Sequence, residues 1–116
     1  MTDTQQNPEH KIVALDALEY FHAFEGLKAK LIHTETQTYS FWEIDKGAIL
    51  PEHSHVNEQV SIITKGELEF TIGGKTTVMK PGMVAVIPPH VVHSAVARTN
   101  VEVTDVFLPI REDFPK

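Results

Sequence analysis

Three histidines and a glutamine have the types and spacing to bind one metal ion. His53 and His55 are two positions apart, and side chains two apart point to the same face of a β-strand. Gln59 follows shortly after, and His93 comes after a pair of prolines. Imidazole suits several divalent ions, and an oxygen donor keeps the choice broad. We predict one divalent transition metal (Ni, Zn, Mn, Fe or Co) on these four residues; the alternative is that they are ordinary polar residues at strand ends.

The amide ligand bears on the chemistry of this predicted site. Three neutral imidazoles and the neutral Gln59 amide would leave the full double charge on the ion. Such a shell suits a Lewis acid that binds an anionic or carbonyl-bearing substrate better than it suits an oxygen-activating centre. Rapid, metal-dependent O₂ uptake with a bound substrate would contradict this hypothesis.

A second group of candidate residues lies near the C-terminus. Asp105 shares a strand face with Val103 and Phe107, because all three are spaced by two. An aspartate on a core-facing surface is costly unless it is paired or used. Two readings stay open: an ion pair with Arg111 or Arg98, or an acid/base group that points into the same site as the metal.

Short β-strands are the elements that must position these residues. Apolar or alternating segments are separated by Gly and Pro turns, and no long helical pattern is present. Residues 11–24 fit no single period. We expect an all-β fold, a closed barrel or jelly roll, with residues 1–10 as a flexible arm and 11–116 as a single domain. The expected strands are 28–33, 37–44, 60–64, 67–72, 76–79, 83–87, 91–97 and 101–108.

Composition narrows the function classes. The net charge of −6 argues against a nucleic-acid partner, although a local site could still bind an anionic small molecule. The chain has no cysteine, hence no disulfide and no thiolate ligand. Its start lacks the pattern of a signal peptide, and its apolar runs are too short to span a bilayer. We therefore expect a cytoplasmic protein without a membrane partner.

The spacing of Gly and Pro residues around the candidate ligands resembles that of the two motifs of the cupin family. Residues 47–66 resemble the first motif, and residues 81–97 resemble the second, which supplies the last histidine. The resemblance implies a single-domain cupin, a double-stranded β-helix or jelly-roll barrel, with the metal inside its mouth. Gln59 departs from the family pattern, because an acidic ligand is usual at that position. The motif residues are Gly47, His53, His55, Gln59 and Gly66, then Pro81, Gly82 and His93.

The C-terminal tail is similar to that of the small KdgF-type cupins of pectin degradation. Its pattern is Asp-x-Phe-x-Pro-x-Arg-x-Asp-Phe, starting at Asp105. The resemblance implies conversion of 4,5-unsaturated uronate monosaccharides, from pectin or alginate, into linear keto sugar acids. It assigns catalytic roles to Asp105, Phe107 and Arg111, with Phe107 and Arg111 also contacting the sugar acid. His90, near the site by sequence, is a further candidate for substrate contact.

Other functions and the assembly remain open at this stage. A cupin could also be a non-catalytic metal or ligand-binding module, or a metal-dependent dioxygenase or isomerase with another substrate. Residues 17–24 are more apolar than one small barrel needs. Because small cupins often exchange such strands, we predict a homodimer.

Overall fold

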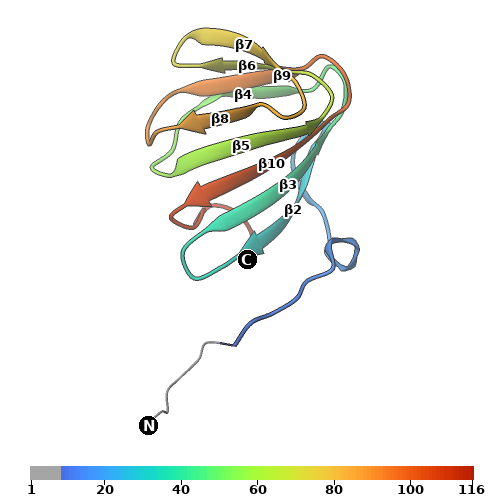
Figure 1. The fold of residues 1–116 in the computed structure, drawn as a ribbon, viewed down its shortest axis with the longest axis vertical. Helices are drawn as coiled ribbons and strands as arrows, with labels where there is room; N and C mark the ends of the chain where they lie inside the picture. The colour runs from blue at the N-terminus through green and yellow to red at the C-terminus, as the bar shows by residue number, and fades with distance from the viewer. Residues whose placement is uncertain (1–8) are drawn as a thin grey trace.

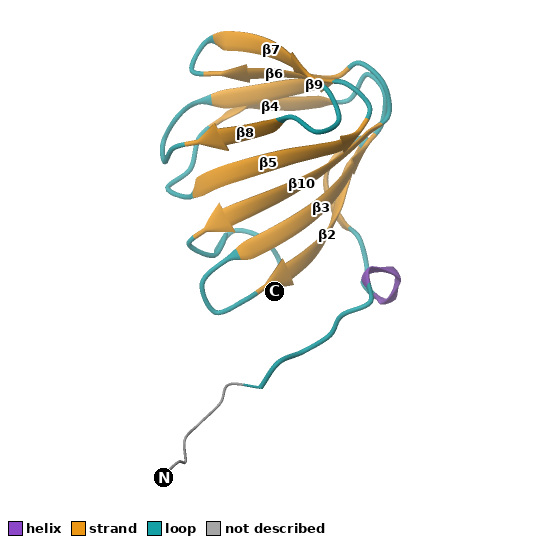
Figure 2. Ribbon diagram, in the orientation of Figure 1, coloured by secondary structure: helices purple, strands orange, loops and turns teal. Residues whose placement is uncertain are grey.

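The computed structural model describes residues 9–116 and consists almost entirely of antiparallel strands (Figures 1 and 2). The predicted all-β jelly roll is confirmed: ten strands form two sheets that face each other. One sheet has six strands in the order β1-β2-β3-β10-β5-β8, and the other has four in the order β4-β9-β6-β7. Helix is limited to a 3-10 turn at Leu15–Ala17, and no helix among the described residues could cross a membrane.

The observed strands match the expected ones to within two residues and add two more. The additions are β1 and β4, for which the sequence predicts no bounds; the arm predicted at 1–10 lies almost wholly outside the described residues. The bounds are β1 Phe21–Phe24, β2 Leu27–His33, β3 Thr38–Ile44, β4 Ile49–His53, β5 Glu58–Lys65, β6 Leu68–Ile72, β7 Lys75–Met79, β8 Val84–Ile87, β9 His93–Ala97 and β10 Val101–Leu108.

The two sheets enclose an apolar core at one end and a polar cluster at the other. Inward positions alternate with outward ones along β3, β5 and β10, as the period of two requires. Toward one end these inward side chains are Trp42, Ile63 and Val103, which belong to the hydrophobic core. Toward the other end the same strands carry polar residues, so the strand register itself places polar groups inside the barrel.

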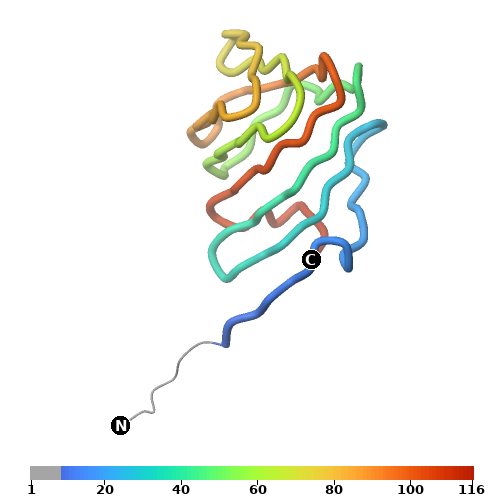
Figure 3. The backbone as a smooth tube through the Cα atoms, turned by 45° about the vertical axis from the view of Figure 1, so that its right-hand side comes forward, coloured from blue at the N-terminus to red at the C-terminus, as the bar shows by residue number. Residues whose placement is uncertain are grey.

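Long-range pairing brings distant segments of the chain together. β10, near the C-terminus, lies between β3 and β5, as the backbone tube also shows (Figure 3). The connection from β5 to β6, which passes from one sheet to the other, turns at Gly66, whose φ is +81°; a Cβ there would lie 2.1 Å from the Asn100 carbonyl oxygen. Only glycine permits this close approach, which explains why the first motif has a glycine at this position.

Candidate metal centre

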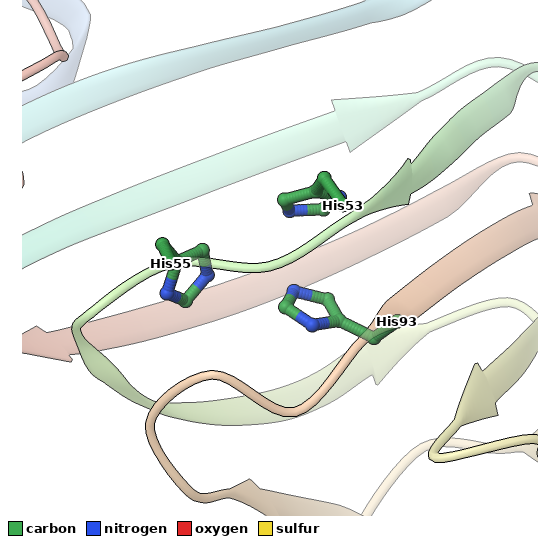
Figure 4. Close-up of side chains that lie close together, drawn as sticks. All are labelled: His53, His55 and His93. Atoms are coloured by element: carbon green, nitrogen blue, oxygen red, sulfur yellow. The ribbon is translucent and has the colours of Figure 1, made fainter.

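His53, His55 and His93 converge from three different segments (Figure 4). His53 ends β4, His93 begins β9, and the two residues are direct partners in the β4–β9 pair. His55 lies in the loop beyond β4, so the expectation that His53 and His55 share one strand is wrong: the strand ends at His53. One nitrogen from each ring lies within 4.8 Å of the others, close enough for one metal ion to be held between them.

A local irregularity in β4 directs His53 toward the other histidines. The β4–β9 register shifts between Leu50 and His53, around Pro51, which has no N–H to donate to the ladder. The Pro51 carbonyl oxygen accepts a hydrogen bond of 3.0 Å from His53 Nδ1. The same proline therefore ends regular pairing and fixes the orientation of the ring.

All three rings use Nδ1 in the same way. His55 Nδ1 lies 3.0 Å from the Asn57 carbonyl oxygen, and His93 Nδ1 lies 2.9 Å from that of Val91. A carbonyl can only accept, so each Nδ1 carries the proton and each neutral ring keeps its lone pair on Nε2. Burial lowers the pKa of His55 below its ordinary value and that of His93 to about 4, so both are neutral near pH 7.

Gln59 completes the set of donors. It lies on the inward face of β5, and its Oε1 is 3.0 Å from His55 Nε2. With His55 neutral and Nδ1-protonated, two lone-pair atoms face each other across this distance. His93 Nε2 is also buried and lacks a hydrogen-bond partner within residues 9–116. A cation would satisfy all of these atoms, so the donor set fits a divalent metal ion.

Asp105 lies beside this centre, at the middle of β10. Its strand partners are Ser40 on β3 and Ser61 on β5, and all three side chains are buried. Burial raises the pKa of Asp105 to about 6, while the Ser61 hydroxyl and the charge of Arg111 act in the opposite direction. Neither predicted ion pair of Asp105, with Arg111 or with Arg98, is found among the described residues.

Arg111 is held instead by its own tail. Its Nε and Nη2 donate to the two carboxylate oxygens of Asp113 at 2.8 and 2.7 Å. The guanidinium lies over the rings of Phe107 and Phe114, at 4.8 and 4.0 Å from their centroids. This contact with Arg111 holds the pKa of Asp113 below its usual range. The arginine is therefore buried and fixed in orientation.

One cavity of about 500 Å³ joins these groups. Its lining includes His53, His55 and Gln59, and also Asp105, Phe107 and Arg111, whereas the buried His93 is not part of the lining. His90 is exposed and does not line the cavity; its backbone N–H donates to the His55 carbonyl oxygen at 2.8 Å. The structure thus brings the predicted residues to one site except His90, which supports the loop. Aromatic side chains of Phe21, Phe24, Trp42, Phe70 and Phe114 also line the cavity.

Sequence reasoning missed two residues of this site. Ser61 accepts a hydrogen bond of 3.0 Å from Gln59 Nε2. Its position two residues after Gln59 was a usable signal, because both share one strand face. Asn57 Nδ2 donates to the carbonyl oxygens of Pro109 and Ile110 at 2.6 and 3.2 Å. No local signal could reveal that contact, since it joins residues more than fifty positions apart.

A small jelly roll with histidines gathered beside an internal cavity is typical of the cupin class. The chain belongs to this family: the profile of the cupin domain matches residues 40–107. No curated protein sequence gives a significant match.

Solved structures agree with this assignment. The chain is similar to an RmlC-like cupin from Shewanella frigidimarina NCIMB 400, with 30% identity over 90% of this chain and 96% of that one and a TM-score of 0.84. It is similar to KdgF from a Halomonas species, with 26% identity over 90% and 98% of the two chains and a TM-score of 0.85. A salicylate 1,2-dioxygenase from Pseudoaminobacter salicylatoxidans shares the fold alone, at 19% identity over 73% of this chain and 27% of that one, with a TM-score of 0.70.

Proposed function

We propose that this protein is a metal-dependent enzyme that converts 4,5-unsaturated uronate monosaccharides into linear keto sugar acids. The observation that carries the proposal is the single cavity that joins the histidine and glutamine donors to Asp105 and Arg111. Similarity to KdgF supports the same conclusion. His53, His55, Gln59 and His93 would hold one divalent ion, which when bound supplies Lewis acidity toward substrate oxygens.

Asp105 is the proposed acid/base. The conversion is an isomerisation: the ring C–O bond at the hemiacetal carbon breaks as its hydroxyl loses a proton and becomes a carbonyl. The departing ring oxygen gains one proton and becomes an enol, which then loses a proton from oxygen and gains one on carbon, so the product is an isomer of the substrate. A carboxyl group with a pKa of about 6 can both accept and return such protons near neutral pH.

Arg111 and Phe107 are the proposed substrate-binding groups. The Arg111 guanidinium is already fixed by Asp113 and by the two aromatic rings, so it can receive a sugar carboxylate with little further loss of side-chain freedom. Phe107 lines the cavity and presents an apolar wall to the sugar ring. The expected ligand is therefore a small anionic sugar acid.

The test is metal analysis of the purified protein, then incubation with 4,5-unsaturated galacturonate while the enol-ether absorbance is followed. We expect the signal to fall faster than in buffer, chelation to abolish the gain, and Asp105→Ala to lower kcat by about 10²–10⁴-fold. Glu58→Gln is the matched control, because Glu58 is an exposed acid next to Gln59 and outside the cavity. Binding without turnover would support a non-catalytic module, and O₂ uptake would support a dioxygenase.

We also propose that the protein forms a homodimer through the outer face of the six-stranded sheet. Two rows of mostly apolar side chains, formed by directly paired residues of neighbouring strands, cross this face. At the edge strand β8 these rows are open to solvent, because Val84 and Val86 are 53% and 65% exposed. Within the single chain β1 pairs with β2, and the outer face is a surface for the dimer in addition to the strand exchange expected from the sequence. One row is Val86, Val60, Val106, Tyr39 and Ile32; the other is Val84, Ile62, Thr104, Phe41 and Lys30.

A further inference from the structure

We propose that Ser61 is a positioning residue that orients the Gln59 amide so that its oxygen faces the metal centre. The inference rests on the metal centre of the proposed function and adds a residue to it. Ser61 and Gln59 are two positions apart on the inward face of β5, and Ser61 is fully buried. Gln59 Nε2 donates to Ser61 Oγ at 3.0 Å, while Gln59 Oε1 points to His55 Nε2.

An amide ligand needs such a partner because its two ends differ. The oxygen carries lone pairs and can bind a metal, whereas the NH₂ group is a donor without a free lone pair. Rotation by half a turn about the last side-chain bond would exchange the two ends at almost no steric cost. Ser61 alone cannot decide between them, because a hydroxyl both donates and accepts.

Asp105 settles the direction of the hydrogen bonds. It is the partner of Ser61 in the β5–β10 pair, both side chains are buried, and the Ser61 hydroxyl and the Gln59 amide both favour the charged form of its carboxyl. A carboxylate can only accept, so Asp105 draws the Ser61 proton and the Gln59 NH₂ group, not the Gln59 oxygen, to its side. The lone pairs of Ser61 Oγ are then left for the Gln59 NH₂ group. The series Gln59 to Ser61 to Asp105 therefore leaves Oε1 facing the histidines.

Ser40 offers a matched control within the same row. It is the partner of Asp105 on the opposite side, in β3, and is as fully buried as Ser61. Its hydroxyl oxygen lacks a hydrogen-bond partner among the described residues, and it makes no hydrogen bond to Gln59. Ser40→Ala thus removes the same atom at the same depth and leaves the amide undisturbed.

The experiment measures Zn²⁺ affinity of the metal-free protein by competition with a chelator at pH 7.5. We expect Ser61→Ala to weaken Zn²⁺ binding about 10–100-fold, the usual effect of losing a partner of a metal ligand, and Ser40→Ala to change it by less than about threefold. Gln59→Glu provides the decisive background, because a carboxylate presents an oxygen at both ends. In that background Ser61→Ala should cost less than about threefold.

Two results would overturn the proposal: equal effects of Ser61→Ala and Ser40→Ala, or an equal loss from Ser61→Ala with and without Gln59→Glu. Absence of Zn²⁺ and Co²⁺ binding by the wild type would also overturn it. Thermal melting of the metal-free variants checks that each is folded, and the visible spectrum of bound Co²⁺ reports the change of ligand directly. None of these readouts uses uronate turnover. The proposed role of Ser61 and the proposed reaction can therefore fail independently of each other.

Discussion

Asp105 shows how burial changes the properties of a single residue. The carboxyl is enclosed by two serine-bearing strands, and desolvation disfavours its charged form. In a folded protein without metal this costs stability whenever the group ionises. A carboxylate kept in such a place is more typical of a functional group than of a packing residue.

The cost predicts a pH-dependent effect of Asp105→Asn in the metal-free protein. Because folding raises the pKa of Asp105 to about 6, its contribution to stability is complete below pH 4 and is lost as the pH rises through 6. The free energy of unfolding of Asp105→Asn, relative to wild type, should therefore increase by roughly 2–3 kcal/mol between pH 4 and pH 7. Urea denaturation in the presence of a chelator measures it.

Comparing Asp105→Asn with wild type cancels the contributions of the other titrating groups to the pH dependence of stability. The pKa values of His55 and His93 are lowered by burial, and both residues are present in wild type and variant. A difference in stability that stays constant from pH 4 to pH 7 would show that Asp105 ionises as freely in the folded chain as in the unfolded one.

At the scale of elements, one loop and the C-terminal tail build one side of the site. The loop between β4 and β5 carries His55 and Asn57, and the tail after β10 carries Arg111. Asn57 links them: its carbonyl oxygen accepts from His55, and its side chain donates to the tail carbonyls. Thr38 holds the tail from the other side by accepting the Arg111 backbone N–H at 2.9 Å.

Asn57→Ala should separate the tail from the metal loop. It removes the donor to two carbonyl oxygens while it keeps the backbone contact with His55, so the tail and Arg111 should loosen and metal binding should persist. We expect a loss of about 1–3 kcal/mol in the free energy of unfolding and a higher KM for the uronate. Chemical denaturation, steady-state kinetics and Zn²⁺ titration measure the three quantities.

A matched variant tests whether the contact itself matters. Glu58→Ala changes the next residue, which is exposed, and should leave KM and stability near wild type. Equal KM values for Asn57→Ala and wild type would contradict the proposed link between loop and tail.

At the scale of the whole molecule, the two faces of the six-stranded sheet have different roles. Its inner face carries Gln59, Asp105 and the core, and its outer face is apolar across several strands. Contiguous exposed apolar surface of this kind marks interaction sites in many proteins. A second copy of the chain can cover it by a two-fold axis, which makes the same patch self-complementary.

Val86→Glu should therefore convert the proposed dimer into a monomer without unfolding the chain. Val86 is 65% exposed in the isolated chain, so the charge is tolerated there but would be buried in the dimer. Ile49→Glu is the control, because Ile49 is 60% exposed on β4 of the other sheet. Sedimentation at micromolar concentration distinguishes the cases. A wild-type monomer, or a dimer that survives Val86→Glu, would contradict the proposed interface.

The sequence by itself determined the fold class and most candidate ligands, for physical reasons that act locally. Alternation in segments such as Leu68–Ile72 specifies which face is buried. Turn residues with special backbone needs, such as Gly66, mark where strands end. These signals depend on near neighbours along the chain, so they can be interpreted without knowing the tertiary structure.

Only the tertiary structure decided how the candidates combine. The register of β10 between β3 and β5 placed Asp105 between two serines, and it committed Arg111 to Asp113 in place of Asp105. His90 was near the site in sequence but exposed in space. Pairings of this kind join residues far apart in the chain, and their partners are fixed by strand register and burial. Sequence spacing predicts which face of a strand is buried, but it carries no information about the register between strands.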